Sequence, residues 1–234
     1  FDVKTTCITF FGGLLFDTQI LTLREEGMLD SMLRSHCKQK IEANQYRLLY
    51  RASEHAFSAA KFHELCDNHR CLVVVVHNDH GHVFGGYQHL SFQPERMWFS
   101  VNEMSETKEL PSFHHDDSAM LFLLRSSHTK PSNLAKKYLP RISNKCSATT
   151  TVYKQETGPC FGDRFGGMDI WISDRCNEVH SHSEPGNGFQ VKQSNEFSGG
   201  EQSGKQWKYL VTEYEVFEIG QLDGDLVYRK PWGK

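Results

Sequence analysis

The chain has 234 residues, of which 24% are charged and 38% are hydrophobic, including 16 Phe, so its composition is that of a folded globular protein and excludes a disordered chain. Its 26 basic and 29 acidic side chains nearly cancel to a net charge of -3, which argues against a broad nucleic-acid or anionic-membrane footprint. No apolar stretch approaches the ~20 residues that a membrane-spanning helix needs.

The length fits one domain around a single sizeable core. We expect this domain to occupy residues 1–221, and residues 222–234 to form a tail that leads towards another domain. The chain begins with Phe1 and not with Met, so we expect it to be part of a longer protein. Its seven cysteines are odd in number and scattered, with Cys66 and Cys71 as the only close pair, which favours a reduced, cytoplasmic compartment over a disulfide framework.

Two helices are predicted in the first third of the chain. The first covers residues 22–37 and opens with Thr22 followed three residues later by Glu25, the pattern of a reciprocal capping box. Met and Leu side chains follow at helical spacing and give this helix one apolar face. The second helix runs from Ser58, which has the side chain of a helix cap, to Cys66.

Strands are predicted to dominate the rest of the chain. The run Cys71–Val76 is short, apolar and rich in β-branched residues, and we expect it to pair as an antiparallel hairpin with Val83–Tyr87 across a polar turn. Residues 184–208 are rich in Gly, Ser, Gln and Asn, and are expected to form surface loops around one weak strand. Further strands are predicted at residues 7–11, 14–16, 46–50, 96–101, 119–125, 148–153, 169–173 and 209–219.

Turn signals, and not regular helices, separate these strands, which argues against βαβ crossovers and a parallel sheet. We therefore predict an α+β fold that is mostly β. It should be an antiparallel β-sandwich of two sheets flanked by a few short helices.

Nine segments follow one another in the order of a known family. They are residues 48–53, 57–58, 62–63, 66–67, 84–87, 121–125, 158–162, 167–177 and 213–217. Together they resemble the signature of the TLDc domain, the module shared by the oxidation resistance proteins, over residues 48–219. The positions that carry the motif are Gly85, Gly86, Tyr87, Gly158, Pro159, Gly162, Gly166, Gly167, Asp169, Asp174 and Cys176. The chain departs from the family pattern at residues 163–165, which look like an insertion, and near residues 197–200, where the loop is long.

The resemblance implies the β-sandwich predicted above, and a role in protection against oxidative stress through binding of the vacuolar proton-pumping ATPase (V-ATPase). It implies no catalytic residue, because none is established for the family. Residues 228–232 also resemble the junction in interferon-induced GTPase-like proteins, where a TLDc-like domain precedes a nucleotide-binding one. The phosphate-binding loop itself is absent from the sequence.

The glycine and aspartate positions of the motif have a structural interpretation. Gly85 and Gly86 allow another segment to approach the hairpin closely. Asp169 and Asp174 flank the apolar residues 170–172, where their carboxylates are expected to accept backbone amide hydrogen bonds.

Candidate chemical groups are few. Metal ligands could come from His114-His115-Asp116-Asp117, from the pair His80 and His82, or from His180 and His182, but neighbouring side chains on an extended segment face opposite ways, so solvated loops are expected and no metal or cofactor is predicted.

Among the cysteines, Cys66 is expected in the core. Cys160 and Cys176 lie beside turns and near Arg164 and Arg175, so they are expected to be exposed and are the candidates for a redox-active thiol. No Cys-x-x-Cys motif is present.

Three hypotheses follow. The first is a non-catalytic intracellular interaction domain of TLDc type, recruited to organelle membranes through a protein partner such as the peripheral subunits of the V-ATPase. The second is an accessory domain of a GTPase-like protein, and the third is a thiol- or metal-dependent enzyme.

Overall fold

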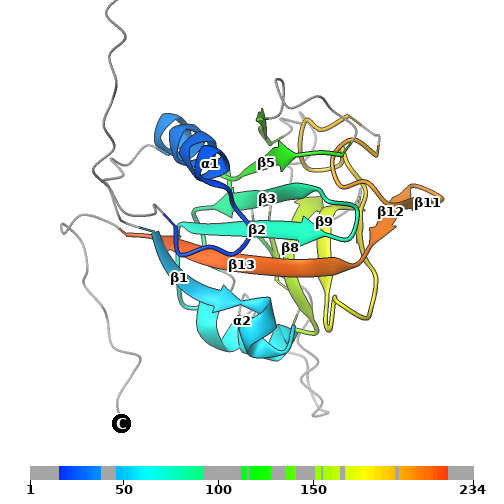
Figure 1. Cartoon of the computed structure of the whole chain (residues 1–234), viewed down its shortest axis with the longest axis horizontal. Coiled ribbons are helices and arrows are strands. Elements are labelled where there is room, and N and C mark those ends of the chain that lie inside the picture. The colour runs from blue at the N-terminus through cyan, green and yellow to red at the C-terminus, as the bar shows by residue number, and fades with distance from the viewer. Residues whose placement is uncertain are drawn as a thin grey trace, which may run out of the picture.

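A computed structural model describes residues 16–37, 46–91, 112–114, 116–127, 135–140, 151–153, 155–163, 167–192 and 195–220, with the backbone alone for 112–114 and 151–153. These residues form two β-sheets in which all the strand pairs are antiparallel (Figure 1). The antiparallel β-sandwich predicted from the sequence is confirmed.

Both predicted helices are present. Helix α1 covers Leu23–His36, and its start is the predicted capping box, in which the Thr22 side chain accepts from the Glu25 amide and the Glu25 carboxylate accepts from the Thr22 amide. Helix α2 covers Ala59–Cys66 and is capped by the Ser58 hydroxyl. A short 3-10 turn, Ala52–His55, precedes α2.

The first sheet has six strands in the order β1-β13-β2-β3-β5-β6. Their bounds are β1 Tyr46–Arg51, β2 Leu72–Asn78, β3 Val83–Gln88, β5 Met120–Arg125, β6 Lys136–Tyr138 and β13 Val211–Ile219. Strands β2 and β3 form the predicted hairpin, with Val74 opposite Gly86.

The second sheet has seven strands in the order β11-β12-β10-β9-β8-β7-β4. Their bounds are β4 Ser112–His114, β7 Thr151–Tyr153, β8 Thr157–Asp163, β9 Gly167–Ser173, β10 Ser181–Ser183, β11 Glu201–Ser203 and β12 Gln206–Tyr209.

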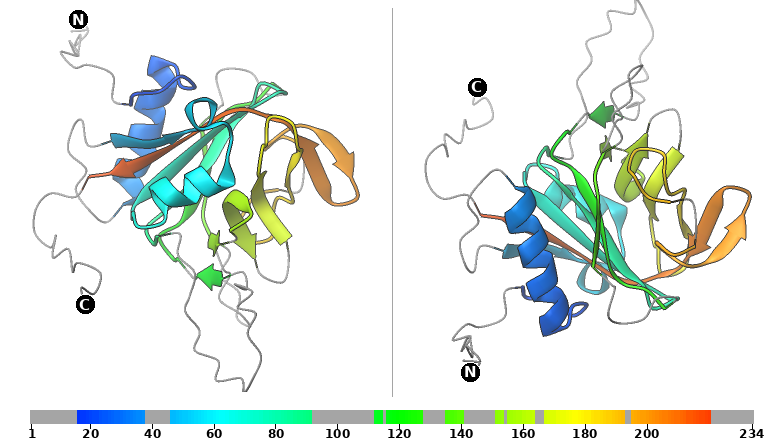
Figure 2. Two further views of the ribbon diagram at one scale, coloured as in Figure 1. Left: turned by 90° about the horizontal axis from the view of Figure 1, so that it is seen from below. Right: turned by 90° about the horizontal axis from the view of Figure 1, so that it is seen from above.

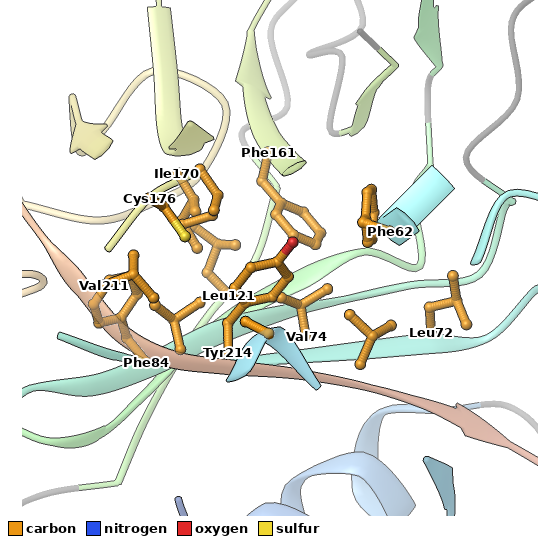
Figure 3. Close-up of a cluster of buried hydrophobic side chains, with 14 of the residues drawn as sticks. Phe62, Leu72, Val74, Phe84, Leu121, Phe161, Ile170, Cys176, Val211 and Tyr214 are labelled. Carbon is orange, nitrogen blue, oxygen red and sulfur yellow. The ribbon is translucent and has the colours of Figure 1, made fainter. Parts of the chain in front are cut away.

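The first sheet is covered on both faces, so the molecule has three layers. On one face, Val74 and Leu121 pack against Phe161 and Ile170 of the second sheet (Figure 3). On the other face, α1 lies across the sheet (Figure 2), and a separate apolar cluster joins the two. This explains why residues 71–76 read as an unbroken apolar run, because both sides of the strand are buried.

Two expectations for strands and loops were wrong, and the seven-residue strand β8 was missed. The single strand predicted at 209–219 is divided at Leu210, where the chain leaves the second sheet and enters the first. Residues 184–208 contain the first strand and most of the second strand of the hairpin β11–β12, and not one weak strand. Strand β8 was missed because Gly158, Pro159 and Gly162 break the strand pattern, and register shifts against β9 accommodate them.

Several predicted strands lie outside the described residues. These are residues 7–11, residues 14–16 apart from Phe16, residues 96–101, and the first part of 148–153. The tail at 222–234 lies outside them as well.

Candidate functional site

The motif glycines of the hairpin lie where other atoms come too close for a side chain. A Cβ atom on Gly85 would stand 1.9 Å from the backbone oxygen of Val74, and one on Gly86 would stand 2.7 Å from the ring of Phe161. Tyr87, next in the chain, is 3% exposed and faces the core beneath α1. The predicted close approach is confirmed, and these residues form the scaffold rather than a binding surface.

Asp169 holds a loop through backbone amides, as predicted. One oxygen of its carboxylate accepts from Gly186 (2.7 Å) and Asn187 (3.3 Å), and the other accepts from Gly188 (2.6 Å). The side chain is fully buried, and this burial raises the pKa of Asp169 to about 7 although the amides favour the charged form. The carboxylate therefore fixes the loop at 186–188 from within the second sheet.

Asp174 joins the second sheet to α2. Its carboxylate accepts from the amide of Ala59, the first residue of the helix, at 2.9 Å. The Arg175 amide donates to the Phe57 carbonyl at 3.0 Å. The prediction that this aspartate accepts a backbone amide is confirmed.

Four of the remaining motif positions lie in β8 and β9. Gly158 and Pro159 are buried in β8, and Gly162 packs so closely that a Cβ atom would stand 2.6 Å from the Gly167 backbone. Gly167, at the start of β9, has φ +119°, which favours glycine. Gly166 lies outside the described residues.

The expectation that Cys160 and Cys176 are exposed is wrong, because both are 0% exposed, and Cys176 belongs to the core between the sheets. Burial raises the pKa of the Cys176 thiol to about 12, and the Cys160 thiol is hydrogen-bonded to Thr157 and Gly158. Neither thiol has the solvent access of a reactive thiol. Cys66 is in the core, as predicted.

The histidine pairs are not solvated loops throughout. His82 is fully buried and contacts Phe197 and Ser127, and His182 lies in β10 with its ring stacked on Trp171. Asp116 is also buried, and accepts from the amides of His89, Leu90 and Ser118. The side chains of 114 and 115 lie outside the described residues. Among the residues that the structure describes, no three His, Cys, Asp or Glu side chains are grouped for a metal ion.

A buried ion pair that the sequence analysis did not single out joins the two ends of the domain. Arg51 of β1 donates to Glu215 of β13 at 2.8 Å, and their side chains are 7% and 0% exposed. Glu215 also accepts from Thr18 (2.5 Å) and from the Gln19 amide (2.8 Å), which fixes the segment that leads into α1. The signal in the sequence was the presence of a charged residue, Arg51 and Glu215, in each of two strands that are largely buried.

The surface is hollowed beside β6, the edge strand of the first sheet. The hollow has a volume of about 280 Å³. It is lined by Lys136, Tyr138, Gln190, Val191, Lys192, Glu196 and Phe197. The Gln190 amide donates to the Leu139 carbonyl at 3.0 Å, so the segment after residue 189 is attached to the strand.

The hollow has an apolar floor and a rim that carries two lysines and one glutamate. On the floor, the ring of Tyr138 meets the ring of Phe197 edge-on with centroids 5.8 Å apart. On the rim, Lys136 pairs with Glu196 and Lys192 is exposed. Leu139, next to the hollow, is 41% exposed. A hollow of about 280 Å³ with an apolar floor has room for an apolar side chain of a partner.

Comparison with known families gives one match. The family model described as the TLDc domain matches residues 18–220, which is most of the chain. The chain belongs to the TLDc family. No curated protein matches the sequence.

The TLDc match begins before α1, so the helix and the cluster beneath it lie within the matched range. The residues that line the hollow also lie within the range that the family model matches. Neither described helix of this TLDc domain has the length and apolar character to cross a membrane.

Proposed function

We propose that this TLDc domain is a non-catalytic interaction module that protects against oxidative stress through a protein partner. The observation that carries the proposal is the position of the motif residues. The glycines at 85, 86 and 162 allow close packing, and the carboxylates at 169 and 174 hold backbone amides. What the motif specifies is a rigid scaffold, and a scaffold of this kind acts through the surface that it supports.

The partner that the resemblance suggests is the peripheral sector of the V-ATPase. In this account the domain is cytoplasmic and reaches organelle membranes through that partner, and it binds no nucleic acid because its charges nearly balance. The contact surface would be the hollow beside β6. Its apolar floor and its lysines fit an acidic segment of the partner that inserts one apolar side chain.

The test is direct binding of the purified chain to the isolated peripheral sector of the V-ATPase. Lys192→Glu reverses a charge on the rim, and we expect it to weaken binding about tenfold, which corresponds to about 1.4 kcal/mol. Lys205→Glu is the matched control, because Lys205 is exposed in the turn between β11 and β12, and it should bind as the wild type does.

The outcomes separate the partner from the surface. No binding by the wild-type chain would remove the V-ATPase as the partner. Binding that Lys192→Glu and Lys205→Glu leave equally strong would show that the hollow is not the contact surface.

A further inference from the structure

One wall of the hollow belongs to the same short stretch of chain that a buried carboxylate holds. Asp169 is fully buried in β9, and its carboxylate accepts from the backbone amides of residues 186–188. The next residue, Phe189, is fully buried, and residues 190–192 line the hollow. One continuous segment, residues 186–192, therefore runs from the carboxylate to the hollow.

This segment is packed against the second sheet at one end and attached to the first sheet at the other. A Cβ atom on Gly188 would stand 2.7 Å from the carbonyl carbon of Gly162 in β8, so the segment cannot move towards that strand. Beside β6, Phe189 pairs with Pro140 in a β-bridge, and the Gln190 side chain donates to the Pro140 carbonyl at 3.2 Å. Because Gly188 is adjacent to this attachment, a displacement of Gly188 is carried to the wall of the hollow.

The Asp169 side chain holds the segment firmly only while it is ionised. An ionised carboxylate accepts at both oxygens, whereas a protonated one carries a hydroxyl group that donates. One oxygen faces the amides of residues 186 and 187, and the other faces the Gly188 amide at 2.6 Å. A proton on either oxygen therefore competes with an amide at that oxygen and weakens the hold on the segment.

The neighbouring strands carry titratable residues of their own. Asp163 of β8 lies opposite Gly167, and the Glu184 carboxylate, which follows β10, also lies beside Gly167. His182 of β10 stacks on the tryptophan of β9, and burial lowers the pKa of its imidazole. The groups that accept a bond from none of these and donate to Asp169 itself are backbone amides.

The Asp169 carboxyl changes charge near neutral pH. Burial raises its pKa to about 7, although the amides favour the charged form. None of the residues that line the hollow is a histidine. A change in the hollow near neutral pH is therefore expected to follow the ionisation of this one carboxyl group.

We propose that Asp169 is a positioning residue for the hollow, and that binding at the hollow requires its carboxylate to be ionised. The inference rests on the proposed function in taking the hollow as the contact surface. An apparent affinity falls in proportion to the fraction of the chain that is competent to bind. For a carboxyl that titrates at about pH 7, the ionised fraction is about tenfold smaller at pH 6 than at pH 8, so the affinity should also be about tenfold lower.

The first test needs no partner. Amide NMR spectra of the isotope-labelled chain are recorded between pH 6 and pH 8. The amides of residues 186–188 should shift with a midpoint of about pH 7, and those of residues 191 and 192 should shift with the same midpoint. Asp169→Asn should remove this shared transition. The Gly27 amide should not show it, because α1 lies on the far face of the first sheet (Figure 2).

The second test measures binding to the peripheral sector of the V-ATPase at the same two pH values. The wild-type chain should bind about tenfold more weakly at pH 6 than at pH 8. Asp169→Asn cannot ionise and should bind weakly at both. Asp117→Asn is the matched control, because Asp117 is exposed, and it should follow the wild type.

The outcomes separate this inference from the choice of partner. Signals of residues 191 and 192 that stay unmoved while those of residues 186–188 titrate would overturn it, as would a wild-type chain that binds equally well at pH 6 and pH 8. If the chain does not bind the peripheral sector at all, the V-ATPase fails as the partner, and the shared transition alone decides whether Asp169 positions the hollow. The wild-type titration needs no variant, so a variant that fails to fold does not prevent the test.

Discussion

Gly85 leaves no room for a side chain, and this makes a sharp prediction at the scale of one residue. Gly85→Ala would place Cβ 1.9 Å from the backbone oxygen of Val74, so the hairpin must move apart. We expect a loss of about 3 kcal/mol or more in the free energy of unfolding. Denaturant unfolding followed by circular dichroism measures this loss.

Gly27 is the matched control, because it is an exposed helical residue and nothing lies within 4 Å of the position that a Cβ atom would take there. Gly27→Ala should stabilise the domain by roughly 0.5–1 kcal/mol. Equal effects of the two substitutions would show that the close approach at Gly85 is absent in solution.

Asp169 makes stability depend on pH. Its folded pKa, about 7, is above the ~3.9 of an unfolded Asp, so the folded state binds a proton that the unfolded state releases. The stability from this difference is fully present below pH ~4 and is lost as the pH rises through about 7. Asp169→Asn cannot titrate, so the stability difference between wild type and variant should shrink from pH 4 to pH 7.

Urea unfolding of both proteins across this range gives that difference directly. At every pH the variant should be the less stable of the two. In asparagine an NH2 group replaces one carboxylate oxygen, so a hydrogen-bond donor faces the amide donors of the 186–188 loop. A difference that instead grows with pH would mean that the amides outweigh burial and lower the pKa.

At the scale of elements, two ion pairs on the same pair of strands differ in burial. Arg51 opposite Glu215 is buried, whereas Arg47 opposite Glu218 has an arginine side chain that is 62% exposed. Arg51→Ala would leave the Glu215 carboxylate buried without its cation, at a cost of about 3–5 kcal/mol. Arg47→Ala should cost less than about 1 kcal/mol.

Thermal unfolding of the two variants measures the contrast. Arg51→Ala should also loosen the segment before α1, because Glu215 holds Thr18 and the Gln19 amide, and hydrogen exchange can detect this. Similar melting temperatures for the two variants would contradict the role given to the buried pair.

Elements with a strong local signal were predictable. The capping box of α1, the hydroxyl cap of α2 and the valine hairpin each depend on residues close in the sequence, and all three are confirmed. Strand β8 was not predictable, because the bulges that accommodate Pro159 and Gly162 depend on pairing with β9. The division at Leu210 was hidden because both sides of it are β-prone and only the tertiary structure assigns them to different sheets.

The candidate sites, too, were predictable only where a local sequence pattern marks them. The roles of Asp169 and Asp174 were predictable, because an aspartate beside a strand commonly accepts amides. The burial of Cys160 was not, since glycine and proline neighbours indicate a turn where the structure has a core strand. The hollow joins segments distant in the chain, and no local pattern marks it.

At the scale of the whole molecule, three layers are fixed from within by their motif residues. The two cysteines first suspected of redox chemistry are fully buried. Cys37 is partly exposed, and burial raises the pKa of its thiol. Under the proposed function, protection against oxidants comes through a partner and not through peroxide turnover.

The most direct measurement of this claim is the rate of hydrogen peroxide consumption by the purified chain with excess thiol reductant. We predict a rate no faster than that of the same cysteines in the urea-unfolded chain, and unchanged in Cys160→Ser and Cys176→Ser. Rapid turnover that a single cysteine substitution abolishes would contradict the non-catalytic account.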